Sequence, residues 1–307
     1  MSTYITLDGG TTSTRLSLVR DGNVCDRIKL DIGVRSCIDR REDYLAALKN
    51  AINEILLRNN ATAERILASG MVTCEFGLCN LPHIGAPAGI DELHGRMYET
   101  VISEISEIPF VFIRGVKTDG EDVADFDMMR GEETELMGIL GDYGDCLYIL
   151  PGSHSKHIQT DKKGRIVTFS TMLTGEMIFA LSQDTILKDA VDLKTEKIDE
   201  EYLLKGYETA LRCGVNKTLF KVRVLKNIFG CSKEQVYSFF MGAVLCDEIA
   251  AITESEVPTV VLGGRMQIKR AMALILRSVT AKKVIELDEK RVDESTAIGA
   301  VRIYEHR

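Results

Sequence analysis

The sequence Asp8-Gly-Gly-Thr-Thr-Ser-Thr-Arg15 joins two short apolar runs near the start of the chain. Its two glycines let backbone N–H groups approach an anion closely, and its hydroxyls can donate hydrogen bonds to phosphate oxygens. The carboxylate of Asp8 can hold a hydrated Mg²⁺ beside them. An ordinary β-turn is the alternative, because glycine and threonine are common in turns. We predict a phosphate-binding hairpin whose contacts come from Gly9, Gly10, Thr11, Thr12 and Ser13.

Length and composition place the chain among globular proteins. Its 307 residues suffice for two domains, and 45% hydrophobic with 27% charged residues is ordinary for a soluble protein. A net charge of −8 argues against a nucleic acid or an anionic membrane as the main partner, because both would be repelled. An anionic substrate then needs cations placed at its own site.

The cysteines and histidines do not form a metal motif. The eight cysteines are scattered, mostly in apolar runs, and no C-x-x-C pair occurs among them. They are typical of reduced core thiols, and the start of the chain lacks a signal peptide. No apolar run is long enough to cross a bilayer. We therefore expect a cytoplasmic protein without a zinc site.

Hydrophobic periodicity predicts alternating strands and helices in the first half. The order is a β-meander, a helix, a strand, an irregular loop, a strand and a helix. Their ranges are 4–30, 42–59, 65–69, 70–96, 108–113 and 129–140.

The second half repeats this organisation. It begins with a strand and a hairpin, continues with helices, and closes with strand, helix, strand and helix. The strands are expected at 146–150, 166–169, 257–262 and 283–287. The helices are expected at 171–187, 200–212, 222–229, 233–253, 267–278 and 295–304, where small residues in the last one favour close helix packing.

Three glycine loops each follow a strand: the Asp8 turn, Pro151-Gly-Ser-His154, and Gly263-Gly-Arg265. Ligands of α/β sheets collect at the carboxyl ends of strands, so one nucleotide could touch all three loops in a cleft between two domains. Gly152 and Ser153 suit a phosphate, and Gly263 and Gly264 suit an adenosine or an α-phosphate.

Five segments carry a resemblance to the bacterial 2-dehydro-3-deoxygalactonokinase family of the sugar kinase and actin-like ATPase superfamily. They span nearly the whole chain in order, and the second and third are specific to the family. The segments are Asp8 to Arg15, Met129-Arg-Gly-Glu-Glu-Thr-Glu-Leu-Met-Gly138, Leu150-Pro-Gly-Ser-His-Ser-Lys156, Thr171-Met-Leu-Thr-Gly-Glu176 and Leu262-Gly-Gly264. One departure is Gly9, where relatives often carry an aromatic residue.

The resemblance implies an α/β fold of two actin-like (ribonuclease H-like) ATPase domains with an interdomain cleft. The expected domains are 1–128 and 141–294, connected by the helix 129–140, with the helix 295–307 packing back near the junction. The implied reaction is the ATP-dependent phosphorylation of the terminal C6 hydroxyl of 2-dehydro-3-deoxy-D-galactonate, giving the 6-phosphate and ADP. ATP and Mg²⁺ are the implied cofactors, with Asp8 binding the metal through water.

The catalytic base is expected in the first connecting segment, where related sugar kinases carry a carboxylate. The segment offers Asp127, Glu132 and Glu133, and we favour Glu132 narrowly over Glu133. A carboxylate at a helix N-terminus is stabilised in its ionised form, although paired glutamates are also ordinary at helix starts. Glu176 is a further candidate, either as base or as a group that orients the substrate.

The carboxylate of a 2-keto acid requires a fixed cation. Arg130 is the preferred partner because a guanidinium binds a carboxylate with two hydrogen bonds, and Arg15 is the alternative. His154 and Lys156 could contact the γ-phosphate or the substrate.

Two other functions are compatible with these motifs. One is a kinase for another sugar or sugar acid, such as 2-keto-3-deoxygluconate, and the other is a non-catalytic sensor of the same fold. The sequence fixes neither the epimer nor the oligomeric state, and a homodimer is one option.

Overall fold

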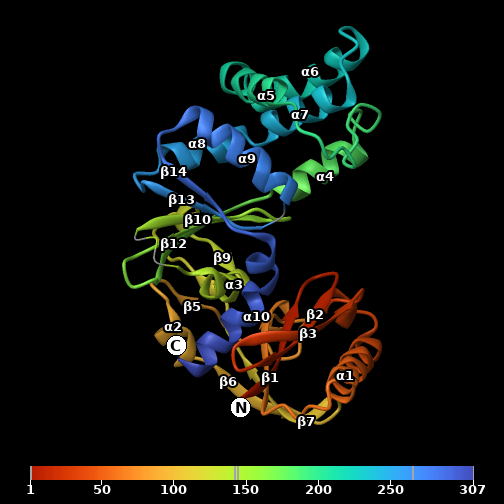
Figure 1. Ribbon diagram of the computed structural model, residues 1–307, viewed down its shortest axis with the longest axis vertical. Coiled ribbons are helices and arrows are strands. Elements are labelled where there is room, and N and C mark those ends of the chain that lie inside the picture. Colours follow the sequence, from red (N-terminus) through yellow and green to blue (C-terminus); the bar gives the residue numbers. More distant parts are fainter. Residues whose placement is uncertain (1, 142, 144, 265, 307) are drawn as a thin grey trace. The chain divides into compact units, whose positions relative to one another are not determined.

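The computed structural model describes residues 2–141, 143, 145–264 and 266–306, so Arg265 of the third glycine loop lies outside the described residues. The chain forms two compact units (Figure 1). Unit 1 comprises Met1–Asp142, Thr160–Phe169 and Glu289–Arg307. Unit 2 comprises Tyr143–Gln159 and Ser170–Asp288.

The main sheet of unit 1 has six strands in the order β3-β2-β1-β4-β7-β6. The strands are β1 (Thr3–Gly9), β2 (Thr14–Arg20), β3 (Asn23–Leu30), β4 (Arg65–Gly70), β6 (Tyr98–Ile102) and β7 (Ser106–Phe112). The first three form the predicted antiparallel meander. Because β4 runs parallel to β1 and to β7, the carboxyl ends of these three strands share one edge.

The core of unit 1 lies between this sheet and α1 (Arg41–Arg58), which confirms the helix predicted there. Tyr44, Leu48, Ile52 and Ile55 recur at helical spacing and are fully buried against the apolar side chains of the sheet. The short helix η1 (Val34–Cys37) precedes α1 and packs behind the Asp8 turn.

The segment 70–96 is largely irregular, as expected. It contains η2 (Met71–Thr73), β5 (Ile84–Gly85) and α2 (Ile90–His94). A small sheet in the order β5-β8-β9 adds β8 (Val116–Lys117) and β9 (Met128–Met129), and η3 (Val123–Asp125) lies between them.

Two helices cross closely in unit 1, α3 (Glu132–Ile139) and α10 (Glu289–Glu305). A Cβ on Gly138 would lie 1.9 Å from the carbonyl oxygen of Ser295, and one on Gly299 would lie 1.8 Å from that of Thr134. The small residues of the last helix therefore pack as predicted. α3 begins later than residue 129, because Met128 and Met129 pair in β9, and α10 begins earlier than Ser295.

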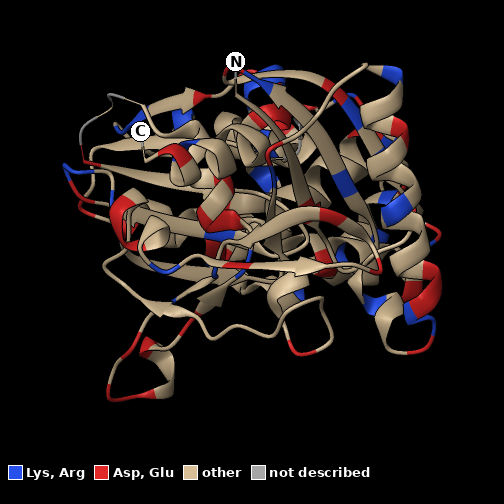
Figure 2. Ribbon diagram, turned by 90° about the horizontal axis from the view of Figure 1, so that it is seen from below, with Lys and Arg blue, Asp and Glu red and all other residues tan. Residues whose placement is uncertain are grey.

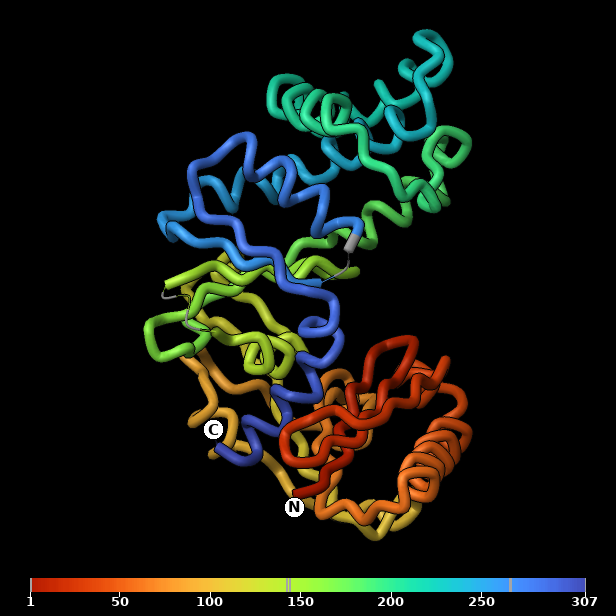
Figure 3. Tube along the Cα trace, in the orientation of Figure 1, coloured from red at the N-terminus to blue at the C-terminus, as the bar shows by residue number. Residues whose placement is uncertain are grey.

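The C-terminal helix returns to the first strand (Figure 3). The hydroxyl of Tyr4 donates to Glu305 at 3.3 Å, and the ring of Tyr304 packs edge-on against Tyr4. Both ends of the chain therefore stabilise the same unit.

A second large sheet has the order β12-β11-β10-β13-β14, and all of it belongs to unit 2 except the parts of β11 and β12 within Thr160–Phe169. The strands are β10 (Cys146–Leu150), β11 (Ser155–Thr160), β12 (Ile166–Met172), β13 (Thr259–Leu262) and β14 (Lys283–Glu286). β13 is parallel to β10 and to β14, so their carboxyl ends also share an edge.

The helices from α4 to α9 belong to the same unit as most of this sheet (Figure 1). They are α4 (Thr174–Asp184), α5 (Glu200–Cys213), α6 (Val215–Asn227), α7 (Lys233–Val244), α8 (Cys246–Glu254) and α9 (Met266–Val279). The single helix predicted at 233–253 is wrong, because α7 and α8 are separate helices bent by 48°.

Across the described residues, no single helix is long and apolar enough to span a membrane, and only the bent α7–α8 pair reaches that length when its two helices are joined. All eight cysteines are free thiols, with Cys25 exposed. Acidic and basic residues are interspersed along the ribbon (Figure 2).

Candidate active site

The Asp8 turn is open on one side. β1 ends at Gly9 and β2 begins at Thr14, and the amide of Gly10 donates to the carbonyl of Ser13 at 3.0 Å. The backbone of η1 donates to the turn carbonyls of Gly10 and Thr11 from behind. Thr11 and Thr12 are exposed, and within the described part of the chain their amides have no hydrogen-bond acceptor. These amides and hydroxyls are donors that a phosphate can use.

Asp8 stands at the base of this turn. Its Oδ2 lies 2.8 Å from a guanidinium nitrogen of Arg15, and its side chain is 20% exposed. Burial raises the pKa of Asp8, and the neighbouring guanidinium opposes that rise. A carboxylate beside open amides fits a hydrated Mg²⁺, which Asp8 would hold through water and which would supply positive charge next to a bound phosphate.

Two glycines bring the start of α3 to Asp8. Gly70 has φ +83°, and a Cβ there would lie 2.7 Å from the carbonyl oxygen of Gly9 and 3.4 Å from Asp8 Oδ1. Gly131 has φ +110°, and its Cβ would lie 3.4 Å from Cα of Gly70. Both positions require glycine for backbone conformation. The Asp8 turn and Glu132 therefore belong to one neighbourhood of unit 1.

The two adjacent glutamates have different surroundings. Glu133 is fully buried and accepts hydrogen bonds from the amide of Gly131 and from the hydroxyl of Thr134. Burial and the nearby Glu132 raise the pKa of Glu133 to about 8. Glu132 is partly exposed, and its Oε2 accepts from the amide of Arg130 at 3.2 Å. Of the two, Glu132 is the one that a substrate can reach.

Glu135 also belongs to this group, and sequence reasoning missed it. Burial raises its pKa, with Glu132 and Asp8 adding to the effect, so three carboxylates interact at this site. The signal was available, because Glu132 and Glu135 are three residues apart and lie on one face of a helix.

Asp127 lies before β9. Its carboxylate accepts a hydrogen bond from the amide of Met128, and its own amide donates to Thr118 Oγ1.

The guanidinium of Arg130 donates to the carbonyl and hydroxyl of Thr73 and to the carbonyl of Leu81. Arg130 therefore fastens the loop after Gly70.

A cavity of about 380 Å³ lies beside this loop and is lined by Pro82, His83, Ile84, Gly85, Glu92, Arg96 and Arg114. Burial, Arg130 and Lys117 lower the pKa of His83 to about 4, so its ring is neutral. Nδ1 lies 3.5 Å from Arg130, which can only donate, so the proton is assigned to Nε2. Nε2 is buried and has no partner among the described residues.

The second glycine turn is built against α4 in unit 2. The amide of Glu176 donates to the carbonyl of Ser153 at 3.1 Å. A Cβ on Gly175 would lie 2.2 Å from the carbonyl oxygen of Gly152, so only glycine permits this approach. The amides of Gly152 and Ser153 have no acceptor in the described ranges.

The side chains that follow this turn have local partners. Nε2 of His154 lies 3.1 Å from Glu176, and both side chains are about half exposed. Lys156 is buried, and its Nζ donates to Thr171 Oγ1 at 2.7 Å.

The third loop packs against the second. The amide of Gly263 donates to the carbonyl of Ile149 at 2.8 Å. Gly264 has φ +68°, and its Cβ would lie 2.3 Å from the carbonyl oxygen of Pro151. The two loops therefore share the carboxyl edge of the β10–β13 pair.

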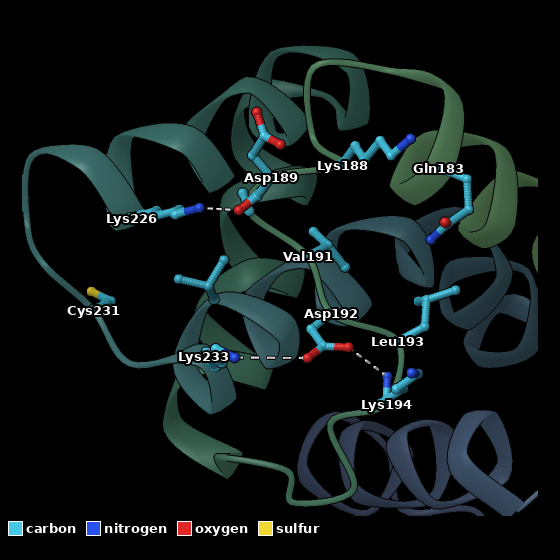
Figure 4. A pocket seen from close by; sticks show the side chains of 12 residues that line it. Gln183, Lys188, Asp189, Val191, Asp192, Leu193, Lys194, Lys226, Cys231 and Lys233 are labelled. Atoms are coloured by element: carbon cyan, nitrogen blue, oxygen red, sulfur yellow. Dashed lines mark hydrogen bonds and ion pairs between the residues drawn. The ribbon is translucent and has the colours of Figure 1, made fainter.

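A separate cavity of about 500 Å³ lies in unit 2, and none of the predicted site residues lines it (Figure 4). Two of its lysines have local acceptors. Lys226 donates to the carbonyl of Asp189, and Lys233 lies 3.9 Å from the carboxylate of Asp192. This cavity is therefore separate from the glycine turns that form the candidate phosphate site.

The two α/β units and their glycine turns define an actin-like phosphotransferase. The fold is shared with the activator of 2-hydroxyisocaproyl-CoA dehydratase from Clostridium difficile, solved with bound ADPNP, at 10% identity and TM-score 0.52 over 99% of this chain and 95% of that one. It is shared more closely with a Sinorhizobium meliloti protein provisionally described as a 2-dehydro-3-deoxygalactonokinase, at 24% identity and TM-score 0.80 over 99% and 98%.

The chain belongs to the 2-keto-3-deoxy-galactonokinase family, whose model matches residues 8–300. The 2-dehydro-3-deoxygalactonokinase of Escherichia coli (strain K12) is 25% identical over 252 residues, which is 82% of this chain and 80% of that protein. The protein is thus a sugar-acid kinase, and the family resemblance of its motifs is confirmed.

Proposed function

We propose that the protein transfers the γ-phosphoryl group of Mg-ATP to the C6 hydroxyl of 2-dehydro-3-deoxy-D-galactonate. The observation that supports the proposal is the approach of Gly70 to Gly9 and of Gly131 to Gly70, because it brings the backbone at the start of α3 next to the Asp8 turn. A phosphate-binding turn next to a base at a helix start is what phosphoryl transfer requires.

Each glycine turn is a phosphate-binding turn in this proposal. The turn from Gly9 to Ser13 supplies amides and hydroxyls in unit 1, and Gly152 with Ser153 supplies them in unit 2. Gly263 and Gly264 are the proposed contacts of the adenosine part of ATP. Asp8 would hold Mg²⁺ through water, and the ion would supply positive charge to the phosphates. His154 and Lys156 lie next to the second turn and remain the proposed contacts of the transferred group.

Glu132 is the proposed base. It accepts the proton of the C6 hydroxyl as that oxygen forms a bond to the γ-phosphorus. The bond between that phosphorus and the β–γ bridging oxygen breaks, and ADP leaves with the electron pair. Glu133 stays buried in the first turn of α3, because it accepts hydrogen bonds from the amide of Gly131 and the hydroxyl of Thr134. Glu176 and Asp127 remain alternatives.

The acid end of the substrate needs cations. Arg15 is paired with Asp8, and Arg130 is occupied by Thr73 and Leu81. We therefore add the cavity with Arg96 and Arg114 as the proposed carboxylate site, because a guanidinium binds a carboxylate with two hydrogen bonds.

The test is an assay of ADP formation with Mg-ATP and a panel of keto-deoxy sugar acids, plain hexoses and no acceptor. ADP released only with 2-dehydro-3-deoxy-D-galactonate supports the proposal. Equal rates with the gluconate epimer would reassign the substrate, and no acceptor-dependent ADP would favour a sensor. The cytoplasmic location expected from the cysteines remains a prediction.

A further inference from the structure

Unit 2 contains a buried carboxylate that the proposed reaction does not use. Glu248, in the first turn of α8, is 2% exposed. It accepts hydrogen bonds from the hydroxyl of Ser155, from Nε2 of His157 at 2.8 Å, and from the hydroxyl of Thr174 at 2.5 Å. These three donors are also buried. A buried carboxylate is costly without such partners, so this cluster is a built feature of the fold.

The carboxylate is held in its ionised form. Burial raises the pKa of Glu248, but the bonds from His157, Ser155 and Thr174 outweigh burial and lower it overall. The position in the first turn of a helix favours the negative charge as well. Hydrogen bonds to an ionised acceptor are stronger than neutral ones.

The three donors come from two elements that form the second glycine turn. Ser155 and His157 alternate along β11 with Lys156, so they occupy the face of the strand opposite to Lys156. Thr174 is the first residue of α4, and the next residue, Gly175, lies against Gly152. Glu248 thus connects the strand after the turn with the helix beside it.

We propose that Glu248 is a positioning residue for nucleotide binding. It fixes β11 and the start of α4 relative to each other, and so holds the amides of Gly152 and Ser153 in the arrangement that phosphate binding needs. It touches neither nucleotide nor sugar acid. This inference rests on the proposed role of the second turn in binding phosphate.

The experiment compares Glu248→Gln with Asp247→Asn, which removes a carboxylate from the adjacent, exposed residue of the same helix. Kd for Mg-ADP is measured by titration calorimetry, and amide hydrogen exchange is followed over 152–156 and 174–177. We expect Glu248→Gln to raise Kd by about tenfold and to speed exchange in both segments, because the charge-assisted bonds are weakened. KM for the sugar acid at saturating ATP should stay unchanged, and Asp247→Asn should behave as wild type.

A second pair of variants distinguishes the loss of the Thr174 hydroxyl from a general disturbance of the fold. Thr174→Val removes one donor at nearly constant shape and should raise Kd, whereas Thr174→Ser should restore it. Unchanged Kd for Mg-ADP in both Glu248→Gln and Thr174→Val would overturn the inference, as would an equal rise in KM for the sugar acid. Failure of the proposed function is distinct, because the wild-type protein itself would then show no acceptor-dependent ADP formation.

Discussion

Glu132 and Glu133 are neighbours in sequence, yet only Glu132 is accessible, and this difference predicts different mutants. Glu132→Gln should lower kcat by about 10²–10⁴-fold, the usual contribution of a general base, while Kd for Mg-ADP stays the same. Steady-state kinetics and calorimetry measure the two quantities. The exposed Glu121→Gln is the control. Retention of most of kcat by Glu132→Gln would transfer the role to Asp127 or Glu176.

Glu133 should instead govern stability against pH. Its pKa is raised from 4.5 to about 8 in the folded protein, so the folded state keeps a proton that the unfolded state has lost between these values. The free energy of unfolding therefore falls as pH rises through this range. Glu133→Gln should reduce the fall in Tm between about pH 6 and about pH 8.5, leaving the part due to Glu135.

Calorimetric scans at several pH values check this, with the exposed Glu42→Gln as the control. A slope in Glu133→Gln as steep as in wild type would show that Glu133 is ionised in the folded protein.

Arg114 tests the carboxylate site. Arg114→Gln keeps the side chain polar but removes its charge, so KM for the sugar acid should rise by about tenfold while KM for ATP is unchanged. Arg212→Gln, an exposed arginine of unit 2, serves as the control. If KM for the acid does not move, the carboxylate binds at Arg130 or Arg15.

At the crossing of α3 and α10 the two helices are so close that a side chain larger than that of glycine does not fit between them. Gly299→Ala would place a Cβ 1.8 Å from the carbonyl oxygen of Thr134, so the helices must separate. We expect a loss of about 1–3 kcal/mol in the free energy of unfolding, although alanine is the better helix former. Urea unfolding measures it, with Lys290→Ala on the exposed face as the control. A gain in stability would mean that the crossing relaxes freely.

The elements that were predictable are those whose signal is local. The meander, α1 and the Asp8 turn follow from alternation, helical spacing and turn residues. The break between α7 and α8 does not, because no glycine or proline marks residues 244–246 and the apolar pattern continues through them. Only tertiary packing separates these helices.

In the candidate site, too, only residues that stand in local sequence motifs could be predicted. Asp8 and Glu132 could be predicted as site residues because they stand in short motifs, whereas the cluster around Glu248 joins residues 155, 157, 174 and 248 from three elements. A sequence pattern has no spacing that links such positions. Likewise, the engagement of Arg130 by Thr73 and Leu81 depends on how the loop folds back.

For the chain as a whole, unit 1 is assembled from three separate segments, the last of which is Glu289–Arg307. This segment supplies α10, whose Ala300, Val301 and Ile303 are buried and whose Arg302 donates to the carbonyl of Met137. A chain ending at Leu287 should therefore lose cooperative unfolding of unit 1, because the face of α3 that packs on α10 would be exposed to water. Circular dichroism and thermal unfolding of the full-length and shortened chains measure this. A shortened chain that unfolds at the same Tm as the full chain, with Mg-ADP binding intact, would show that unit 1 does not need its last segment.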